Sequence, residues 1–165
     1  LNMGWLYLYT DEPDKAAENL EKLAKISPDS KESHHLAGAI YQYLEQDKDA
    51  VVEFKAALSN QASQQAAPDS KLYFDLATSL HKLHQDTEAL SALNQGLSLV
   101  PESDTNTQTN FLFSICSAEY GLKNFERALK NCQKAVSITD DPEEQGHITD
   151  FMENMKLLQN LEEKN

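Results

Sequence analysis

One spacing occurs four times in this chain of 165 residues. A small residue is followed twelve positions later by an alanine: Gly4 and Ala16, Gly38 and Ala50, Ala77 and Ala89, Cys116 and Ala128. The alanines recur at intervals of 34, 39 and 39 residues. A period in this range is typical of stacked supersecondary units, each of which buries its apolar face only against its neighbours. Such a stack presents an extended surface for binding more often than a centre for chemistry.

Other positions near the small residue and the alanine also match between the four copies. In the second copy they are Ala37, Tyr41, Phe54 and Ala57. Offsets of three and four residues keep side chains on one face of a helix. Each copy therefore predicts two helices joined by a short turn, with small residues where the two helices approach closely.

This pattern resembles the tetratricopeptide repeat (TPR) family, which has Trp-x2-Leu-Gly-x2-Tyr on the first helix and Ala-x3-Phe-x2-Ala and a closing Pro on the second. The second copy fits best, at Ala37, Gly38, Tyr41, Ala50, Phe54 and Ala57. The resemblance covers roughly residues 1–140. It departs from the family at the Trp position, which holds His34, Tyr73 and Leu112, and at Glu119, which replaces the Tyr of the fourth copy.

The resemblance implies an all-α, right-handed superhelical solenoid of about four helix-turn-helix hairpins plus a C-terminal capping helix. We expect a single domain over 1–165, with repeats at about 1–30, 31–67, 68–106 and 107–140 and the capping helix at 141–163. The helices are expected near 1–9, 13–26, 31–45, 48–60, 70–84, 86–99, 107–122 and 125–138. The first helix is short and the chain begins at Leu1, so we expect a fragment of a longer chain.

The segments between the predicted helices also contain patterns that predict local structure. The tripeptide Pro-Asp-Ser occurs at 28–30 and 68–70, where its Asp and Ser are expected to cap the following helix. The Gln- and Ala-rich segment 60–67 is expected to extend the helix before it. The segment 102–109, rich in Ser, Thr, Asp and Asn, is expected to be a loop.

The last segment begins with Asp141 and Pro142, a strong helix-start signal. An apolar stripe follows at Ile148, Phe151, Met152, Met155 and Leu158. We expect this stripe to cover the last repeat, because stacked repeats need a terminal cap. The alternative is that the stripe binds a partner.

The chain is strongly acidic, with 14 Lys and Arg against 27 Asp and Glu and a net charge of −13. No basic stripe is apparent, so we expect no binding to nucleic acid, which requires clustered cations, or to anionic membranes. No run approaches the roughly 18 apolar residues that membrane insertion needs. A cationic or amphipathic peptide fits this charge. The alternative is that the acidity only keeps the domain in solution.

In the TPR family the first helix of each repeat lines the inner curve. The resemblance therefore implies a peptide-binding groove lined by Trp5, Tyr9, His35, Tyr43, Phe74, Thr78, His81, Phe113, Ser117 and Tyr120. Aromatic side chains with a polar tip are common binding anchors. The alternative is that several of these residues, Phe74 and Phe113 first, are core between adjacent repeats.

The two cysteines, Cys116 and Cys132, occupy packing positions on the facing helices of the fourth hairpin. They are either a pair of small buried apolar residues or a disulfide in an oxidising compartment. We expect no metal site, because there is no CxxC pattern and no third ligand accompanies His81 and His84. We expect no cofactor.

The sequence has no Gly-rich phosphate loop, no GxSxG and no HExxH, so we expect no enzymatic activity. The predicted function is a scaffold or adaptor that binds a peptide segment of a protein partner in the groove. Two alternatives stay open: a secretion-type chaperone for an unfolded client, and a regulatory domain of a larger enzyme or assembly complex. The compartment is also open between the cytoplasm and, if a signal segment is missing, the periplasm, as is the oligomeric state.

Overall fold

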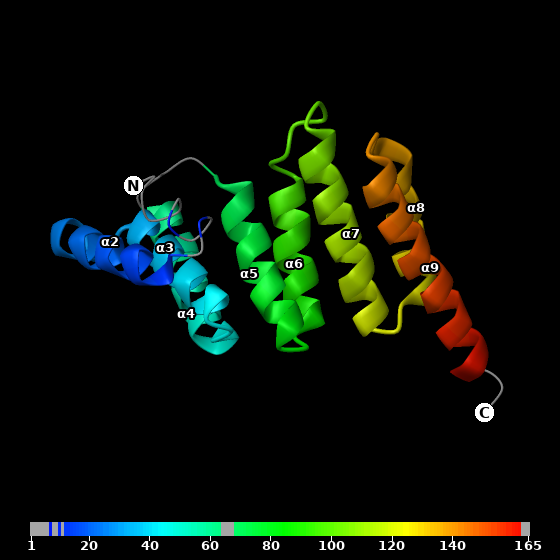
Figure 1. Ribbon diagram of the computed structural model, residues 1–165, viewed down its shortest axis with the longest axis horizontal. Coiled ribbons are helices and arrows are strands. Elements are labelled where there is room, and N and C mark those ends of the chain that lie inside the picture. The colour runs from blue at the N-terminus through cyan, green and yellow to red at the C-terminus, as the bar shows by residue number, and fades with distance from the viewer. Residues whose placement is uncertain (1–6, 8–9, 11, 64–67, 163–165) are drawn as a thin grey trace. The chain divides into compact units, whose positions relative to one another are not determined.

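The structure is a computed structural model that describes residues 7, 10, 12–63 and 68–162. The described part contains eight helices and no strand (Figure 1). The helices are α2 (Pro13–Ile26), α3 (Lys31–Tyr43), α4 (Asp47–Ser63), α5 (Ser70–Lys82), α6 (Asp86–Leu97), α7 (Thr105–Gly121), α8 (Phe125–Ile138) and α9 (Pro142–Glu162). The expected all-α architecture is therefore confirmed, whereas the helix expected at 1–9 lies largely outside the described residues.

The contacts divide the chain into two compact units, Leu1–Leu83 and His84–Asn165. In the N-terminal unit each helix from α2 to α5 packs against the next, and α3 also contacts α5. In the C-terminal unit each helix from α6 to α9 packs against the next. Packing between sequence neighbours is the arrangement that a repeat protein requires. The expectation of a single domain stays a prediction.

Polar side chains fix the beginnings of several helices. Ser30 caps α3 by accepting a hydrogen bond from the Ser33 backbone N–H, and Asp69 caps α5 by accepting one from the Lys71 N–H. Different members of the repeated Pro-Asp-Ser tripeptide therefore perform the same task. Asp141 accepts from the Glu143 N–H at 2.9 Å at the start of α9. These contacts satisfy backbone donors that have no partner within the helix.

The turns that follow α3, α5 and α7 share one feature. Each holds a non-glycine residue with positive φ: Glu45 (56°), His84 (57°) and Lys123 (60°). In the second repeat the next backbone N–H, of Gln46, donates to the Tyr41 carbonyl at 2.8 Å. A left-handed residue with this bond is a common helix C-terminus. It ends α3 and α5 two residues before the ends expected at 45 and 84.

Two connecting segments differ in how well the sequence predicted them. The helix extension expected from residue 60 onward is present, because α4 continues to Ser63. The expected loop at 102–109 is wrong in its second half, since α7 begins at Thr105. Asp104 makes this start possible by accepting a hydrogen bond from the Thr107 N–H at 3.1 Å. A cap followed by a run of Ser, Thr and Asn therefore forms a helix that composition alone would place in a loop.

The repeated small residues lie where helices touch. Ala16, Ala50, Ala89 and Ala128 are all 0% exposed. In the second repeat, a Cβ atom added to Gly38 of α3 would lie 2.5 Å from the Phe54 ring of α4. Only glycine permits this approach, because a heavy atom at that distance would overlap the ring. The alanines of the repeated spacing are therefore core residues, and the close approach of α3 and α4 joins Gly38 to Phe54, four residues after Ala50.

In the C-terminal unit, Cys116 of α7 and Cys132 of α8 form a disulfide with a Cα–Cα distance of 5.4 Å. Both residues are 0% exposed. They occupy the positions that Gly38 and Phe54 occupy in the second repeat. The disulfide interpretation of the sequence thus matches the structure, and the pair is also part of the buried core.

Helix α9 caps the C-terminal unit. Ile148 and Met155 are 1% and 2% exposed and join the core cluster of α7 and α8, with Phe151 and Met152 packed beside them. The capping interpretation of the stripe is therefore confirmed for these four residues. It is wrong for Leu158, which is 49% exposed, because the stripe extends past the part of the core that α9 covers.

Two glycine substitutions should have opposite effects on stability. Gly38→Ala should lower the free energy of unfolding by roughly 1–2 kcal/mol, because overpacking outweighs the gain in helix propensity. Gly146→Ala in α9 should raise it by about 0.5–1 kcal/mol, since an added Cβ meets nothing within 4 Å. Urea unfolding of both variants checks this. A shift of the same sign in both would contradict the packing described here.

Reduction of the disulfide should destabilise the C-terminal unit. Cys116 and Cys132 are 16 residues apart, and closing a loop of about this length contributes roughly 3 kcal/mol. Thermal unfolding with and without a reductant measures the effect. The Cys116→Ala/Cys132→Ala variant is the control, since its stability should not respond to reductant. Two titratable thiols in the unreduced, denatured protein would contradict the pairing.

Candidate functional site

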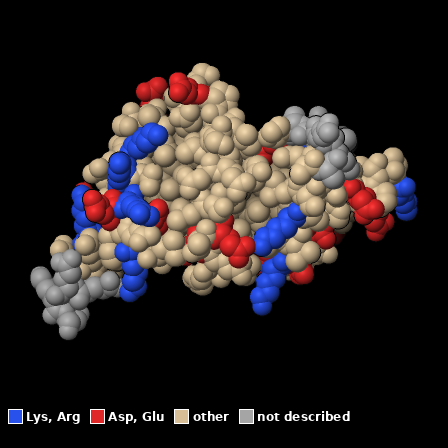
Figure 2. Space-filling view, turned by 180° about the vertical axis from the view of Figure 1, so that it is seen from behind, with Lys and Arg blue, Asp and Glu red and all other residues tan. Residues whose placement is uncertain are grey.

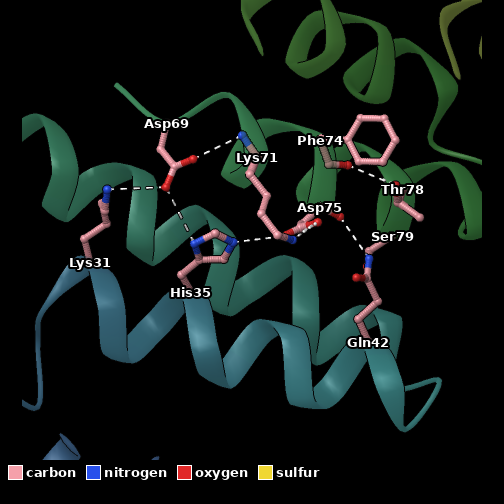
Figure 3. A network of polar contacts seen from close by, with 9 residues as sticks. All are labelled: Lys31, His35, Gln42, Asp69, Lys71, Phe74, Asp75, Thr78 and Ser79. Carbon is pink, nitrogen blue, oxygen red and sulfur yellow. Dashed lines mark hydrogen bonds and ion pairs between the residues drawn. The ribbon is translucent and has the colours of Figure 1, made fainter. Parts of the chain in front are cut away.

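The first helices of the second and third repeats, α3 and α5, lie side by side in the N-terminal unit. Figure 3 shows the polar side chains between them. The ring of His35 on α3 lies with its Nε2 2.8 Å from the Asp75 Oδ2 of α5. His35 is 6% exposed and Asp75 is 7% exposed. A buried polar group is costly unless it is paired, so this contact fixes how the two helices face each other.

A second contact joins the same two helices. The side-chain amide of Gln42 on α3 donates to the Asp75 carbonyl oxygen and to the Ser79 hydroxyl of α5, each at 3.0 Å. Ser79 is fully buried. Together with the His35 contact, this amide joins α3 to α5 from two positions of α3 that lie on different turns of that helix.

Lysines accompany the carboxylates in this network. Lys71 Nζ donates to both Asp75 carboxylate oxygens, at 3.0 and 2.8 Å. Lys31 Nζ lies 3.4 Å from Asp69 Oδ2, and the same oxygen is 4.0 Å from His35 Nδ1. Each carboxylate therefore has a lysine and the imidazole nearby. Local charges are matched at this junction although the whole chain is acidic.

The predicted groove residues of the N-terminal unit fall into three groups. Trp5 and Tyr9 lie outside the described residues. His35 is buried in the network, so its side chain positions α5 and is covered from solvent. Tyr43 is 42% exposed, and Phe74, Thr78 and His81 are partly exposed. In Figure 3, Phe74 and Thr78 point to a different side of α5 from Asp75 and Ser79.

The predicted groove residues of the C-terminal unit, Phe113, Ser117 and Tyr120, lie on α7 and are partly exposed. Phe151 of α9 packs against two of them, with ring-centroid distances of 5.4 Å to Phe113 and 5.8 Å to Tyr120. The capping helix therefore covers part of the face on which these aromatics lie. The interpretation of Phe113 as a packing residue agrees with this contact. A role of the ten residues in binding stays a prediction.

The structure brings together a cluster that the sequence interpretation missed. Lys123, Arg127, Lys130 and Lys134 are all exposed. The last three lie on one face of α8, at spacings of three and four residues, and Lys123 lies in the turn before α8. The expectation that the chain has no basic stripe is therefore wrong. The signal was present in the sequence, but the net charge of −13 concealed a local concentration of cations.

Two further findings concern the described residues alone. In that part of the chain, no group of three or more His, Cys, Asp or Glu side chains is arranged to hold a metal ion. No helix among those described is long and apolar enough to cross a membrane.

An exposed ion pair, Glu12 and Lys15, lies at the start of α2. A hydrogen bond from Lys15 lowers the pKa of the Glu12 carboxyl, and the same contact raises the pKa of the Lys15 ammonium group. Because this pair is in solvent, it contributes little to folding.

The His35–Asp75 pair should be energetically coupled. Asp75→Ala should cost roughly 1–3 kcal/mol of unfolding free energy, because it leaves the buried His35 ring without its acceptor. A double-mutant cycle with His35→Ala, followed by urea unfolding, isolates the pair. Lys71→Ala is the control and should cost less than about 1 kcal/mol, since this side chain is half exposed. Additive effects of His35→Ala and Asp75→Ala would refute the coupling.

Comparisons with known proteins place this geometry in context. The tetratricopeptide repeat family model TPR_8 matches residues 1–30. The comparison with curated proteins gave no match. Among solved structures, MamA 41-end from Desulfovibrio magneticus RS-1 is 19% identical with a TM-score of 0.77, covering 96% of this chain and 82% of that one.

Two more solved structures are similar. The Podosopora anserina putative kinesin light chain with nearly identical TPR-like repeats is 16% identical, with a TM-score of 0.75 and coverage of 99% and 86% of the two chains. YrrB, a TPR protein with an unusual peptide-binding site, is 21% identical, with a TM-score of 0.54 and coverage of 90% and 89%. This chain therefore has the tetratricopeptide repeat fold, and its first repeat matches that family in sequence as well.

Proposed function

We propose that this chain is a protein–protein interaction scaffold that binds a peptide segment of a partner on the first helices of its repeats. The observation that carries the proposal is the α3–α5 pair, which buried polar contacts hold in one arrangement. A surface that is already ordered loses little conformational entropy when a ligand binds. Repeat proteins use such surfaces, built from successive units, to bind extended ligands.

The side chains beside this pair suit a peptide ligand. Tyr43 is 42% exposed, and Phe74, Thr78 and His81 are partly exposed. Tyr and Phe offer a large contact area with few rotatable bonds, and a Tyr hydroxyl can bond to a peptide backbone. The buried His35 acts indirectly, because its contact with Asp75 sets the position of α5.

The charge of the chain favours a cationic or amphipathic segment. The net charge of −13 would raise the association rate of such a ligand. The lysines and carboxylates of the α3–α5 network neutralise one another. The attraction for a cationic segment therefore comes from the acidic side chains outside this network. Binding without catalysis is part of the proposal.

The C-terminal unit contributes differently. Phe113 and Tyr120 pack against Phe151 of α9, so only their remaining exposed area can contact a ligand. We therefore expect the N-terminal unit to provide the main anchors. The peptide-binding site in the name of the similar protein YrrB supports a peptide as the ligand class.

Selection from a phage-displayed peptide library against the intact chain provides a ligand for the test. Tyr43→Ala and His81→Ala should each weaken binding of a selected peptide roughly five- to thirtyfold, the loss expected for an anchor worth about 1–2 kcal/mol. Val52→Ala, at a 64% exposed position of α4, is the control and should leave affinity unchanged. Fluorescence anisotropy measures binding, and circular dichroism checks folding. Unchanged affinity in both groove variants, with normal helicity, would refute the proposal.

A further inference from the structure

The basic stripe on α8 stands out against an acidic background. The C-terminal unit, His84–Asn165, contains 14 Asp and Glu against 6 Lys and Arg. Four of those six cations are the stripe residues Lys123, Arg127, Lys130 and Lys134, and Arg127 is the only arginine of the chain. Figure 2 shows Lys and Arg side chains gathered on this face near the left end of the view, over the C-terminal unit. Folding has therefore concentrated positive charge on one surface.

Packing explains why the stripe faces solvent. The opposite side of α8 carries Ala128, Cys132 and Ala135, which are all 0% exposed and belong to the core cluster with α7 and α9. Arg127, Lys130 and Lys134 occupy another face of the helix and are exposed, as is Lys123 in the turn before it. Because the disulfide joins α7 to α8, the backbone under the stripe is held firmly.

A pocket adjoins the N-terminal end of the stripe. It has a volume of about 420 Å³ and is lined by Lys123, Asn124, Phe125, Glu126, Arg127 and Gln159. Two of these residues belong to the stripe itself. Phe125 is the aromatic residue of the lining, and its ring packs 5.7 Å from the Tyr120 ring. The surface thus combines a line of charge with a recess at one end.

We propose that α8 binds an acidic polypeptide segment of a partner, with carboxylates along the stripe and one end of the segment in the pocket. The three stripe cations on α8, Arg127 to Lys134, span about 10 Å of helix, and Lys123 precedes them in the turn. The three cations on the helix are three or four residues apart, roughly 4.5–6 Å along the axis. Alternate side chains of an extended peptide are about 6.6 Å apart. About five residues with acidic side chains at alternate positions therefore match the stripe.

The surroundings favour a short acidic peptide over a nucleic acid. Glu126 lines the pocket, and carboxylates outnumber cations in the unit as a whole. A nucleic acid carries closely spaced phosphates beyond both ends of so short a stripe, and these would meet the acidic surface. A short peptide with a few carboxylates does not extend past the stripe, so it avoids the surrounding acidic surface. This surface is separate from the proposed groove and selects the opposite charge.

The test uses a fluorescein-labelled peptide of alternating Glu and Ser, about ten residues long, and the intact disulfide-bonded chain. We expect saturable binding that weakens at least tenfold in the Arg127→Glu/Lys130→Glu/Lys134→Glu variant. Raising the salt concentration from about 50 to 500 mM should weaken binding to the unmodified chain similarly, since exposed charges are screened. A peptide of alternating Gln and Ser should not bind.

The control variant is Lys22→Glu/Lys25→Glu/Lys48→Glu, which makes the same change in net charge at exposed lysines of α2 and α4. It should bind the acidic peptide within twofold of the unmodified chain, as should Tyr43→Ala. Equal losses in the control and stripe variants would show a general charge effect and overturn the proposal. Tighter binding of a single-stranded oligonucleotide than of the peptide would also overturn it. Circular dichroism and thermal unfolding establish that both triple variants fold.

Discussion

The close approach of two helices within each hairpin is the constraint on which the rest of this structure depends. In the second repeat, Gly38 admits the ring of Phe54 to a distance that no other residue would permit. In the fourth repeat, the same two positions hold Cys116 and Cys132, which are close enough to form a covalent bond. The chain thus satisfies one geometric requirement in two chemically different ways. Small residues at these positions bring the helices together, and larger neighbours then fill the core.

Contacts between successive repeats are of a different kind. Between α3 and α5 the structure uses a buried histidine, an aspartate and a glutamine where many cores would use only apolar side chains. Polar pairs are directional, and an unpaired buried group is costly, so such contacts specify one relative position of the helices. That property suits a binding surface, whose affinity depends on side chains being held in place before the ligand arrives.

The proposals assign different charge preferences to different surfaces. The first helices of the N-terminal unit carry partly exposed aromatic side chains beside a charge-matched network. The outer face of α8 carries a row of cations in a unit that is otherwise acidic. A scaffold with two such surfaces would hold a cationic or amphipathic segment on one and an acidic segment on the other, because the cations of α8 repel a cationic ligand and attract an acidic one.

The sequence by itself determined the succession of helices, most helix starts and the capping role of α9, because small residues and apolar offsets report local packing. It did not determine that α7 begins at Thr105, since the Asp104 cap overrides a composition typical of loops. It placed His35 on the right helix, but only the tertiary structure paired it with Asp75, forty residues away. Likewise, the sequence contains the cations Arg127, Lys130 and Lys134 of α8, but folding decided that they share an exposed face, because the opposite face of the helix is occupied by the core. Periodicity fixes which residues share a face, whereas the partner of that face depends on contacts between segments far apart in the chain.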